Sequence, residues 1–515
     1  MTSNDGFAEA KQSDDSEETL AGVAKSGVIS LVGSLTSAIM GFALVVVLGR
    51  TLGEIQSGIV LQAIAIFSIA MAVTRMGLDT TGVWLLPRLT ASQPWQVRSA
   101  VGNLMLPAVI CGLLGTLILW FCAPVLATGR DGADGLVQAI RTISWFLAAG
   151  ALMTVALQVT RGLGNIIPYA LIGNIAVPTL RPILAFIVVL LGGTAVGVSL
   201  SWALPLAIGA LLAVWVVFRR VQNVERKAAE TSRTDFSRVE LRKKIWRFSA
   251  PRWYASILEQ SITWFDVVIV GFIAGAGAAG IYGAASRFVT AGLIISTAMR
   301  VVVSPRFSRL LEENRRNDVQ TLYTAATTWI VLFSTPMFVV FIFFAPTILG
   351  WIGEGFEDGA QVLIVLSLAT MISMLFGNAD SLLMMSGRSA VLAINKTLVL
   401  AINIIGNVLL IPKFGILAAA VVWAASMILN AGLAATQNSI LLKISWGGGK
   451  VLYALIVSLV CSIIPCLVLI QLMGQGTGTL IFSVLILLTF LAIWCFMDRK
   501  RLGLRDLVSM RKSKR

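Results

Sequence analysis

The chain has 515 residues, of which 57% are hydrophobic and 13% are charged, and its mean hydropathy is +0.88. A soluble domain carries about 25% charged residues, so this composition excludes a water-soluble globular protein and predicts an all-α polytopic membrane protein. The net charge is +15 and histidine is absent, which excludes histidine general bases and histidine metal ligands. The five cysteines lie in apolar stretches without metal-ligand spacing, and we expect no metal, no cofactor and no catalytic residue.

The first 25 residues are polar and rich in acidic side chains. Segments of low hydrophobicity and high charge rarely fold alone, so residues 1–25 are expected to form a disordered cytoplasmic tail. The first apolar run begins near Gly27 and is longer than the apolar core of a cleaved signal peptide, so we expect no such signal.

Fourteen apolar blocks follow, and each is long enough to cross a bilayer as a helix of about 20 residues. The expected transmembrane helices are 26–49, 57–78, 100–125, 139–160, 167–191, 194–218, 248–274, 280–303, 321–349, 360–385, 389–411, 414–440, 449–472 and 478–497. Two sets of six blocks and a final pair predict two six-helix lobes plus two extra helices. The corresponding domains are an N-terminal lobe at 26–218, a basic cytoplasmic linker at 219–247, a C-terminal lobe at 248–440, helices 13 and 14 at 441–497, and a basic cytoplasmic tail at 498–515.

Lysine and arginine are distributed unequally between the two sides that these helices define. With the N-terminus inside, the inner segments hold 31 basic residues and the outer segments hold 4. Because basic loops stay in the cytoplasm, this bias predicts a multi-pass protein of the cytoplasmic (inner) membrane with both termini cytoplasmic. The basic residues on the inner side account for the net positive charge, because they contact anionic membrane lipids. No nucleic-acid partner is therefore expected. The linker at 219–247 is expected to form an amphipathic helix on the membrane surface.

Two glycine-rich blocks indicate an internal repeat. GRTLGEIQSGIVLQA begins at Gly49, GFIAGAGAAGIYGAA begins at Gly271, and five residues match at an offset of 222. Three further matches at offsets of 218 to 223 join Pro87-Arg88 to Pro305-Arg306, Gly164 to Gly387, and Trp202 to Trp423. Because each set has six helices, the two repeats have the same orientation and are expected to be related by an axis along the membrane normal.

The six-plus-six-plus-two layout, the GxxxGxxxxGI turn and the basic end of the second helix resemble the polysaccharide flippases. These flippases belong to the multidrug/oligosaccharidyl-lipid/polysaccharide exporter superfamily. The resemblance implies two lobes around a central cavity that opens alternately to each side of the membrane. It also implies a polyprenyl-pyrophosphate-linked oligosaccharide as cargo, with a polysaccharide polymerase and glycosyltransferases as candidate partners. Lipid II flippases carry an Arg-Asp pair at the end of helix 1, and LGRTLGE lacks it here, which argues against a peptidoglycan precursor.

Several basic side chains lie inside predicted spans, where a charge costs about 2.5–3.5 kcal/mol and normally faces a wet cavity or a partner. Arg181 and Asn174 are seven residues apart on helix 5, and Lys396 and Asn403 have the same spacing on helix 11. Arg287 lies on helix 8. We expect these five residues to line a cationic cavity that binds the pyrophosphate or an acidic sugar. In the alternative, Arg287 pairs with an acidic residue of helix 7, while Arg181 and Lys396 snorkel or bind carbonyl groups.

Helix 7 carries a polar stripe in which Arg252, Glu259 and Asp266 repeat every seven residues. Glu259 and Asp266 are candidate sites for a coupling proton or sodium ion, and they are also the candidate partners of Arg287.

Other polar and aromatic residues have local interpretations. Asp79 and Asp380 lie near helix ends and are expected to be local partners or caps. The tryptophans expected to anchor the membrane interface or to pack, rather than to stack on sugar rings, include Trp120, Trp202, Trp351 and Trp494.

The leading functional hypothesis is a flippase for a lipid-linked oligosaccharide. The alternative is a cation-coupled exporter of drugs or metabolites on the same fold, which needs an acidic residue deep in a lobe. The basic groups on helices 5, 8 and 11 outnumber the acidic pair on helix 7, which favours the flippase. A membrane glycosyltransferase or polymerase would need carboxylates or metal ligands on sizeable outer loops. The outer loops are short, so we expect neither an enzyme nor a passive scaffold.

Overall fold

The computed structural model describes residues 5–127, 132–228 and 238–497. Every regular element in these three ranges is helical. In chain order the elements are α1 (Asp5–Arg75), α2 (Leu78–Ser92), η1 (Pro94–Gln96), α3 (Val97–Leu126), α4 (Ala133–Ser144), α5 (Leu147–Gly162), η2 (Tyr169–Ala176), α6 (Val177–Leu190), α7 (Ala195–Ala228), α8 (Arg238–Ala274), α9 (Ala276–Gly292), α10 (Ile294–Glu312), α11 (Arg316–Phe343), α12 (Ala345–Gly350), η3 (Phe356–Gly359), α13 (Ala360–Met374), α14 (Ala379–Met385), α15 (Ser389–Leu442), α16 (Gly448–Met473) and α17 (Thr477–Met497).

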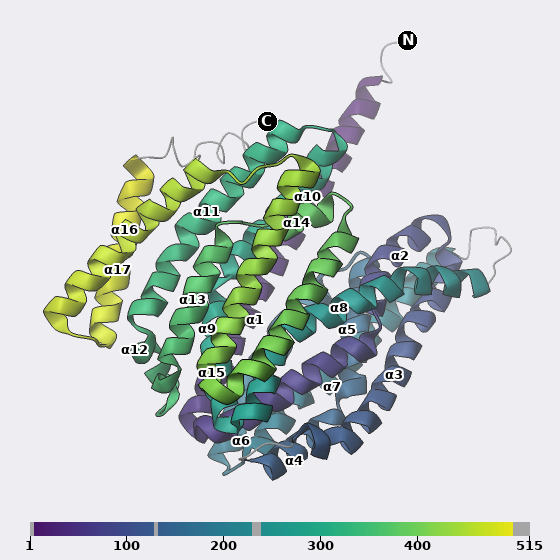
Figure 1. Cartoon of the computed structure of the whole chain (residues 1–515). Helices are drawn as coiled ribbons and strands as arrows, with labels where there is room; N and C mark the ends of the chain where they lie inside the picture. Colours follow the sequence, from purple (N-terminus) through teal and green to yellow (C-terminus); the bar gives the residue numbers. More distant parts are fainter. Residues whose placement is uncertain (1–4, 128–131, 229–237, 498–515) are drawn as a thin grey trace.

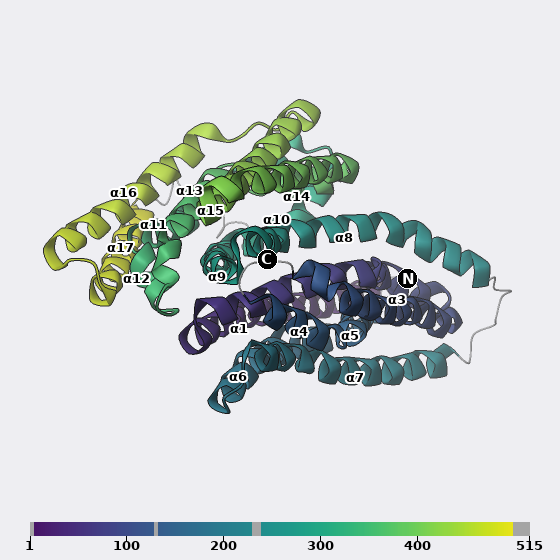
Figure 2. The ribbon, with the colours of Figure 1, turned by 60° about the horizontal axis from the view of Figure 1, so that its bottom comes forward.

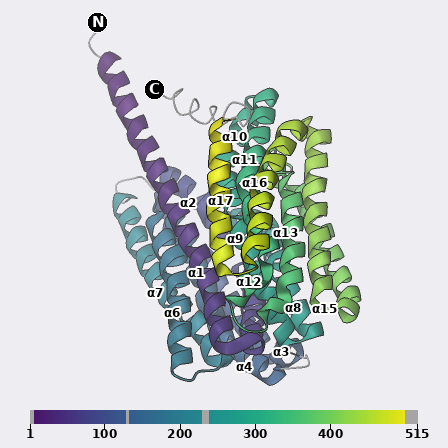
Figure 3. The same cartoon turned by 90° about the vertical axis from the view of Figure 1, so that its left-hand side faces the viewer.

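Two of these helices are too long to cross a bilayer once as straight rods. At 1.5 Å per residue, the 71 residues of α1 and the 54 residues of α15 would measure about 105 and about 80 Å, against an apolar core of about 30 Å. Gly53 interrupts α1 with φ 71° and ψ −177°, and Gly415 interrupts α15 with φ 60° and ψ −147°. Such backbone angles are open essentially to glycine alone. Each glycine divides its helix into two arms, and Figure 3 shows α1 bending back at its lower end.

Ten helices of the described chain are long and apolar enough to cross a membrane. The pairs α4–α5 and α9–α10, bent by 46° and 43°, raise that number to twelve if each pair is one span. The chain is therefore an all-helical, multi-pass membrane protein. The first turns of α1 and the last turn of α17 lie on the same side of the molecule, which we name the terminal face (Figures 1 and 3). The side that carries Gly53 is named the opposite face.

Glycines with positive φ recur along the chain at separations of 222 or 223 residues. The four pairs are Gly53 and Gly275, Gly132 and Gly355, Gly164 and Gly387, and Gly192 and Gly415. Gly53 joins the two arms of α1, and Gly275 joins α8 to α9, so the members of this pair lie at corresponding turns. The recurrence of the same backbone turns extends the glycine matches that the sequence shows.

The helices gather in two groups, an N-terminal half (α1–α7) and a C-terminal half (α8–α17), which Figure 2 shows side by side. In the N-terminal half α3, α5 and α7 pack together, and in the C-terminal half α11, α13 and α15 pack together. The halves meet where α1 packs against α8 and α9. α16 lies against α11 at the edge of the molecule, with α17 beside it (Figure 1).

Two matched glycines allow the halves to approach closely at the opposite face. A Cβ atom added at Gly58 of α1 would lie 3.0 Å from the amide nitrogen of Gly280 of α9, and the reciprocal distance is also 3.0 Å. A Cβ atom at Gly58 would also overlap the carbonyl oxygen of Ala276. The two helices therefore touch through backbone atoms, and any larger residue at Gly58 must push them apart.

Two expectations about polar segments need correction. Residues 5–25 are helical, as the beginning of α1, rather than disordered. This segment has no proline and is rich in good helix formers, so the helix of the first span continues through it. The described parts of the linker, 219–228 and 238–247, extend α7 and α8 instead of forming a separate surface helix. The middle of the linker and the tail at 498–515 lie outside the described residues.

Candidate functional site

A cavity of about 270 Å³ lies between the two halves, where α1, α6, α7, α8 and α9 meet. The two arms of α1 supply an apolar wall with one hydroxyl, from Ser37, Met40, Gly41, Leu44, Val45, Leu61 and Ile64. The other lining residues are Pro178, Arg181, Trp202, Trp264 and Arg287. Two of them are arginines and none is acidic, so the cavity is cationic.

Arg181 reaches the cavity from α6, directly after a stretch of π-helix. Pro178 and Pro182 lack the N–H groups that would complete α-helical hydrogen bonds, and the preceding residues Tyr169–Ala176 adopt the wider π-helix. The Arg181 Cζ atom lies 3.9 Å from the centroid of the Trp202 ring, and Nε donates to the Trp202 carbonyl oxygen at 3.2 Å. The two terminal NH₂ groups of Arg181 therefore remain as donors for a ligand.

Arg287 reaches the cavity from α9 in the other half. Its Cζ atom lies 3.9 Å from the centroid of the Trp264 ring. Among the described residues, no carboxylate pairs with Arg287, so the alternative in which it pairs with Glu259 or Asp266 is wrong. A cation over an aromatic face gains about 2 kcal/mol when it is desolvated, but the ring does not neutralise the charge. The cavity therefore retains both positive charges.

Two guanidinium groups thus converge on one cavity from opposite halves, each held against the face of a tryptophan. A planar guanidinium matches the oxygen pairs of a phosphate and binds them through two parallel hydrogen bonds. Attraction between unlike charges is stronger in such low-dielectric surroundings than in water. The site suits a compact anion that presents several oxygen atoms, and a pyrophosphate group has this chemistry.

Three other residues expected at an anion site, Lys396, Asn174 and Asn403, lie outside the lining of this cavity. The Lys396 Nζ atom lies 3.6 Å from Asp380 Oδ2, and Asn430 Nδ2 donates to the same carboxylate oxygen at 3.2 Å. Asp380 is therefore a local partner, as the sequence predicts. Asn174 lies beside α1, where a Cβ atom added at Gly33 would approach Asn174 Cβ to 3.0 Å.

Asp266 lies in a buried polar cluster between α8, α9 and α15. Asn407 Nδ2 donates to Asp266 Oδ1 at 2.8 Å and contacts Asn403 Oδ1 at 3.0 Å. The side chains of Asn403 and Tyr282 also hydrogen-bond the carboxylate. Asn407 Oδ1 is buried, and none of the described residues donates a hydrogen bond to it. In the part of the chain that the structure describes, no basic side chain pairs with Asp266. Its carboxylate and the amide oxygens of Asn403 and Asn407 are oxygen ligands of the kind that small hard cations prefer.

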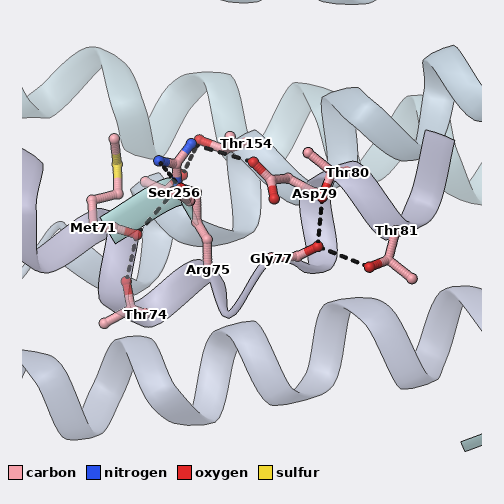
Figure 4. A network of polar contacts seen from close by, with 10 residues as sticks. Met71, Thr74, Arg75, Gly77, Asp79, Thr80, Thr81, Thr154 and Ser256 are labelled. Atoms are coloured by element: carbon pink, nitrogen blue, oxygen red, sulfur yellow. Dashed lines mark hydrogen bonds and ion pairs between the residues drawn. The ribbon is translucent and has the colours of Figure 1, made fainter. Parts of the chain in front are cut away.

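A second cavity, of about 300 Å³, lies between α1, α2 and α8, nearer the terminal face. It is lined by charges of both signs, from Arg75, Asp79, Arg252 and Glu259. Arg75 Nη1 lies 3.4 Å from Asp79 Oδ2, so Asp79 has the local partner that the sequence predicts. Arg75 Nη2 donates to Ser256 Oγ of the other half at 3.5 Å (Figure 4). The polar stripe predicted on the seventh transmembrane helix lies on α8, and its two acidic residues face different surroundings. Glu259 is exposed in this cavity, whereas Asp266 is buried in the amide cluster.

The four tryptophans singled out in the sequence make local contacts. Trp202 packs edge-to-face on Phe67 with ring centroids 5.5 Å apart. The indole nitrogens of Trp351 and Trp494 donate to Thr477 Oγ1 at 3.0 Å and to Tyr453 Oη at 3.4 Å. The ring of Trp120 lies 4.5 Å from the guanidinium carbon of Arg141.

Sequence reasoning missed Trp264, Asn407 and Tyr282. Asn407 follows Asn403 by four residues, which is one helical turn, so a search for paired amides on one helix face would have found it. Trp264 had no comparable signal, because its partner Arg287 lies on the next helix and their contact depends on how α8 and α9 pack.

Residues 23–311, more than half of the chain, match the family described as polysaccharide biosynthesis protein. The chain belongs to this family. One relative is the "Probable low-salt glycan biosynthesis flippase Agl15" of Haloferax volcanii, 26% identical over 42% of this chain and 46% of that protein. Another is the "Probable flippase AglR" of the same organism, 26% identical over 35% of this chain and 39% of that protein. The chain thus spans less than half the length of these curated relatives.

Solved structures of two transport proteins have a similar fold. A lipid II flippase MurJ in an inward closed conformation matches with a TM-score of 0.70 and 14% identity, over 93% of this chain and 100% of that one. An inward-facing multidrug resistance MATE family transporter of the MOP superfamily matches with a TM-score of 0.63 and 14% identity, over 81% and 99%. At 14% identity this likeness shows a shared fold only, so the identity of the cargo has to be inferred from the residues of the cavity.

Proposed function

We propose that this protein is a flippase that moves a polyprenyl-pyrophosphate-linked oligosaccharide across the cytoplasmic membrane. The observation that carries the proposal is the cavity between the halves, where Arg181 and Arg287 converge and no lining residue is acidic. The pyrophosphate binds the two guanidinium groups while the polyprenyl tail remains in the bilayer. Family membership and the flippase names of the two Haloferax relatives support this class of cargo. The partners that we propose for such a cargo are the glycosyltransferases that build the unit and a polysaccharide polymerase that consumes it.

We propose fourteen transmembrane spans, with both termini in the cytoplasm. Ten helices and two bent pairs have the length and composition of spans, and counting both arms of α1 and of α15 adds two more. The first and last described helices end on the same side, as an even number of crossings requires (Figure 3). The excess of basic residues assigns this terminal face to the cytoplasm of an inner membrane.

Transport by alternating access needs contacts between the halves that break at one end of the cavity at a time. At the opposite face, Gly58 lies against Gly280, and Arg50 Nε donates to the Trp351 carbonyl oxygen at 2.7 Å. These contacts close the cavity on the side that we assign to the exterior, and an outward-open state requires that they separate.

Contacts also join the halves at the terminal face. Trp253 Nε1 donates to the Val73 carbonyl oxygen at 2.8 Å, and the hydroxyls of Thr81 and Ser249 lie 2.7 Å apart. The conformation described therefore supports an occluded state, from which either end can open while α1–α7 and α8–α15 move as two lobes.

We propose Asp266, rather than Glu259, as the site of a coupling proton or sodium ion. Asp266 is buried among amide and phenol groups, and Asn407 Oδ1 has no partner in the described structure. Glu259 is exposed and shares its cavity with Arg75 and Arg252, whose charges disfavour a cation.

A cation-coupled exporter of drugs or metabolites remains the second candidate. The MATE-like fold and the buried carboxylate of Asp266 favour it. A drug cation would need a negative cavity, however, and the central cavity carries only the positive charges of Arg181 and Arg287. This difference in sign favours an anionic cargo.

The test is transport by purified protein in proteoliposomes, with a fluorescent polyprenyl-pyrophosphoryl disaccharide as the probe. Arg181→Ala and Arg287→Ala should each slow flipping at least about tenfold, because removal of one partner of a charge-assisted hydrogen bond costs about 1.5–3 kcal/mol. Arg181→Lys should retain partial activity, since the charge survives but the bidentate geometry is lost.

The matched control is Arg219→Ala, because Arg219 also lies over a tryptophan, Trp215 at 4.6 Å, but is exposed at the end of α7. It should flip at the wild-type rate. Normal flipping by correctly folded Arg181→Ala and Arg287→Ala protein would refute the proposal. Faster efflux of a cationic dye than of the lipid probe would support the exporter instead.

A further inference from the structure

A second aromatic and basic cluster lies at the terminal face, where α2 of the N-terminal half meets the first turns of α8. The rings of Trp84 and Phe248 stack with centroids 4.3 Å apart and an interplanar angle of 8°. The guanidinium carbon of Arg88 lies 4.5 Å from the Trp84 centroid, and Lys244 Nζ lies 6.0 Å from it. Arg252 lies 5.8 Å from the Phe248 centroid. This stack belongs to neither the central cavity nor the amide cluster.

A groove of about 590 Å³ opens beside the stack. We name it the basic groove, and its lining residues are Trp84, Glu240, Lys243, Lys244, Arg247 and Phe248. Its three basic residues are exposed, and no ion pair joins any of them to a carboxylate within the described chain. Glu240 is the single acidic residue of this lining against three basic ones, so the groove carries an excess of positive charge beside two aromatic rings and attracts an anion.

Three tryptophans lie on the two helices that border the groove, Trp84 on α2 and Trp246 and Trp253 on α8. Because tryptophan gathers at bilayer interfaces, we place the groove where the membrane meets water. Basic residues just cytoplasmic of a transmembrane helix bind anionic lipids, with about 1 kcal/mol, or about fivefold in affinity, for each lysine or arginine. The terminal face carries the basic excess, so the groove faces the anionic inner leaflet.

A tight seam separates the basic groove from the central cavity. The Thr81 and Ser249 hydroxyls lie 2.7 Å apart and are buried. Gly77 is packed so closely that a Cβ atom there would lie 2.6 Å from the Ser249 carbonyl oxygen and 2.7 Å from the Trp253 nitrogen. A ligand in the groove therefore has no path between α2 and α8 into the cavity, which argues for a resident lipid rather than a transported one.

We propose that the basic groove binds the phosphate headgroup of an anionic membrane phospholipid, and that this lipid bridges α2 and α8. Lys243, Lys244 and Arg247 bind the phosphate from the C-terminal half, while Trp84 contacts it from the N-terminal half through its indole N–H, with Arg88 over the ring. Because the ligand touches both halves, it binds best when the seam is closed. By linkage, the lipid then stabilises the closed seam by the same factor. The proposal holds whichever cargo the central cavity takes.

The test is lipid binding by delipidated full-length protein, measured by native mass spectrometry with phosphatidylglycerol and with phosphatidylcholine. The groove variant is Lys243→Gln with Lys244→Gln and Arg247→Gln, at three exposed positions. The control variant is Arg219→Gln with Arg220→Gln and Arg226→Gln, which removes three exposed charges from α7 at the same face without a groove. The groove variant should bind phosphatidylglycerol at least about tenfold more weakly. The control variant should change less than about twofold, and phosphatidylcholine binding should not change.

Equal loss in both variants would show a general surface-charge effect and overturn the proposal, as would no loss in the groove variant. Displacement of phosphatidylglycerol from the groove by an equimolar polyprenyl pyrophosphate would also overturn it, because the groove would then dock the cargo. Bridging is tested by hydrogen exchange in α2, residues 78–92. Phosphatidylglycerol should slow this exchange in the wild type and in the control but not in the groove variant, and an unchanged rate in the wild type would refute bridging.

Discussion

At the scale of single residues, the site depends on two arginines that tryptophans hold in place. Arg181 is fixed twice by Trp202, through the ring face and through the backbone carbonyl, whereas Arg287 is fixed by the Trp264 ring alone. Both arginine side chains therefore lose little conformational entropy when a ligand binds, and this lower entropy cost raises the affinity.

The first prediction concerns this positioning. Trp202→Leu should weaken binding of a pyrophosphate-linked polyprenol about tenfold or more, since a desolvated cation–π contact contributes about 2 kcal/mol. Trp202→Phe should lose less, because an aromatic face remains. Affinities measured by titration in detergent would check both, and Trp215→Leu, at the exposed Arg219 pair, is the control that should bind normally. Equal affinities for Trp202→Leu and the wild type would show that the ring has only a packing role.

The second prediction concerns Asp266. If this carboxylate binds sodium, sodium chloride should stabilise the folded protein relative to choline chloride, by about 1.4 kcal/mol at ten times the dissociation constant. Asp266→Asn should lose this effect, whereas Glu259→Gln should keep it, because Glu259 is exposed and outside the amide cluster. Thermal unfolding in the two salts measures the difference. A sodium effect that survives in Asp266→Asn would place the ion elsewhere.

The sequence predicted Arg181 and Arg287 in one cavity, but together with Lys396, Asn174 and Asn403, which lie outside its lining. It predicted that Arg181 and Lys396 face each other across the cavity, because the fifth and eleventh expected helices, which are α6 and the first arm of α15, correspond in the repeat. The structure instead brings α6 and α9 to one cavity and gives Lys396 the neighbouring carboxylate of Asp380. Spacing along one helix shows which residues share a face, but packing between helices decides which faces meet.

At the scale of elements, apolar length predicted the helices well, because a bilayer dictates how many residues cross it. The sequence did not predict the bends in α4–α5 and α9–α10, because a bend depends on how the helices pack. The prediction of disorder at the polar start of α1 was wrong for a different reason. Composition there indicates poor burial, but a helix that is already nucleated in the membrane extends at little cost.

The third prediction concerns the glycine contact between α1 and α9. Gly58→Ala should force these helices apart at the opposite face and lower the stability of the closed state by about 1–3 kcal/mol. Gly102→Ala in α3 is the control, since nothing lies within 4 Å of its added Cβ atom and alanine favours the helix. Thermal unfolding compares the two variants. A cysteine replacing Ser57, which is only 1% exposed, should react faster with a polar thiol reagent in the Gly58→Ala background. Identical unfolding and an unreactive cysteine would contradict the role of this contact.

At the scale of the whole molecule, equivalent glycines give the two halves the same turns but different chemistry. The pairs of positive-φ glycines recur at nearly constant separation, whereas the arginines of the cavity do not occupy matching positions. Cations from both halves face the cavity, and only the C-terminal half has the buried carboxylate cluster of Asp266. A repeat can therefore conserve the hinge geometry needed for rocking while each half takes a separate part in binding.

The last prediction tests the orientation from which the whole proposal follows. In a cysteine-free background, Asp134→Cys in the first turn of α4 should react with a membrane-impermeant thiol reagent added to intact cells, because that turn lies at the opposite face. Asn223→Cys near the end of α7 should react only after the cells are opened, because basic residues hold this face in the cytoplasm. Both positions are exposed, so access from one side alone decides the result. Labelling of Asn223→Cys in sealed cells would reverse the orientation, and the basic groove would then face the outer leaflet.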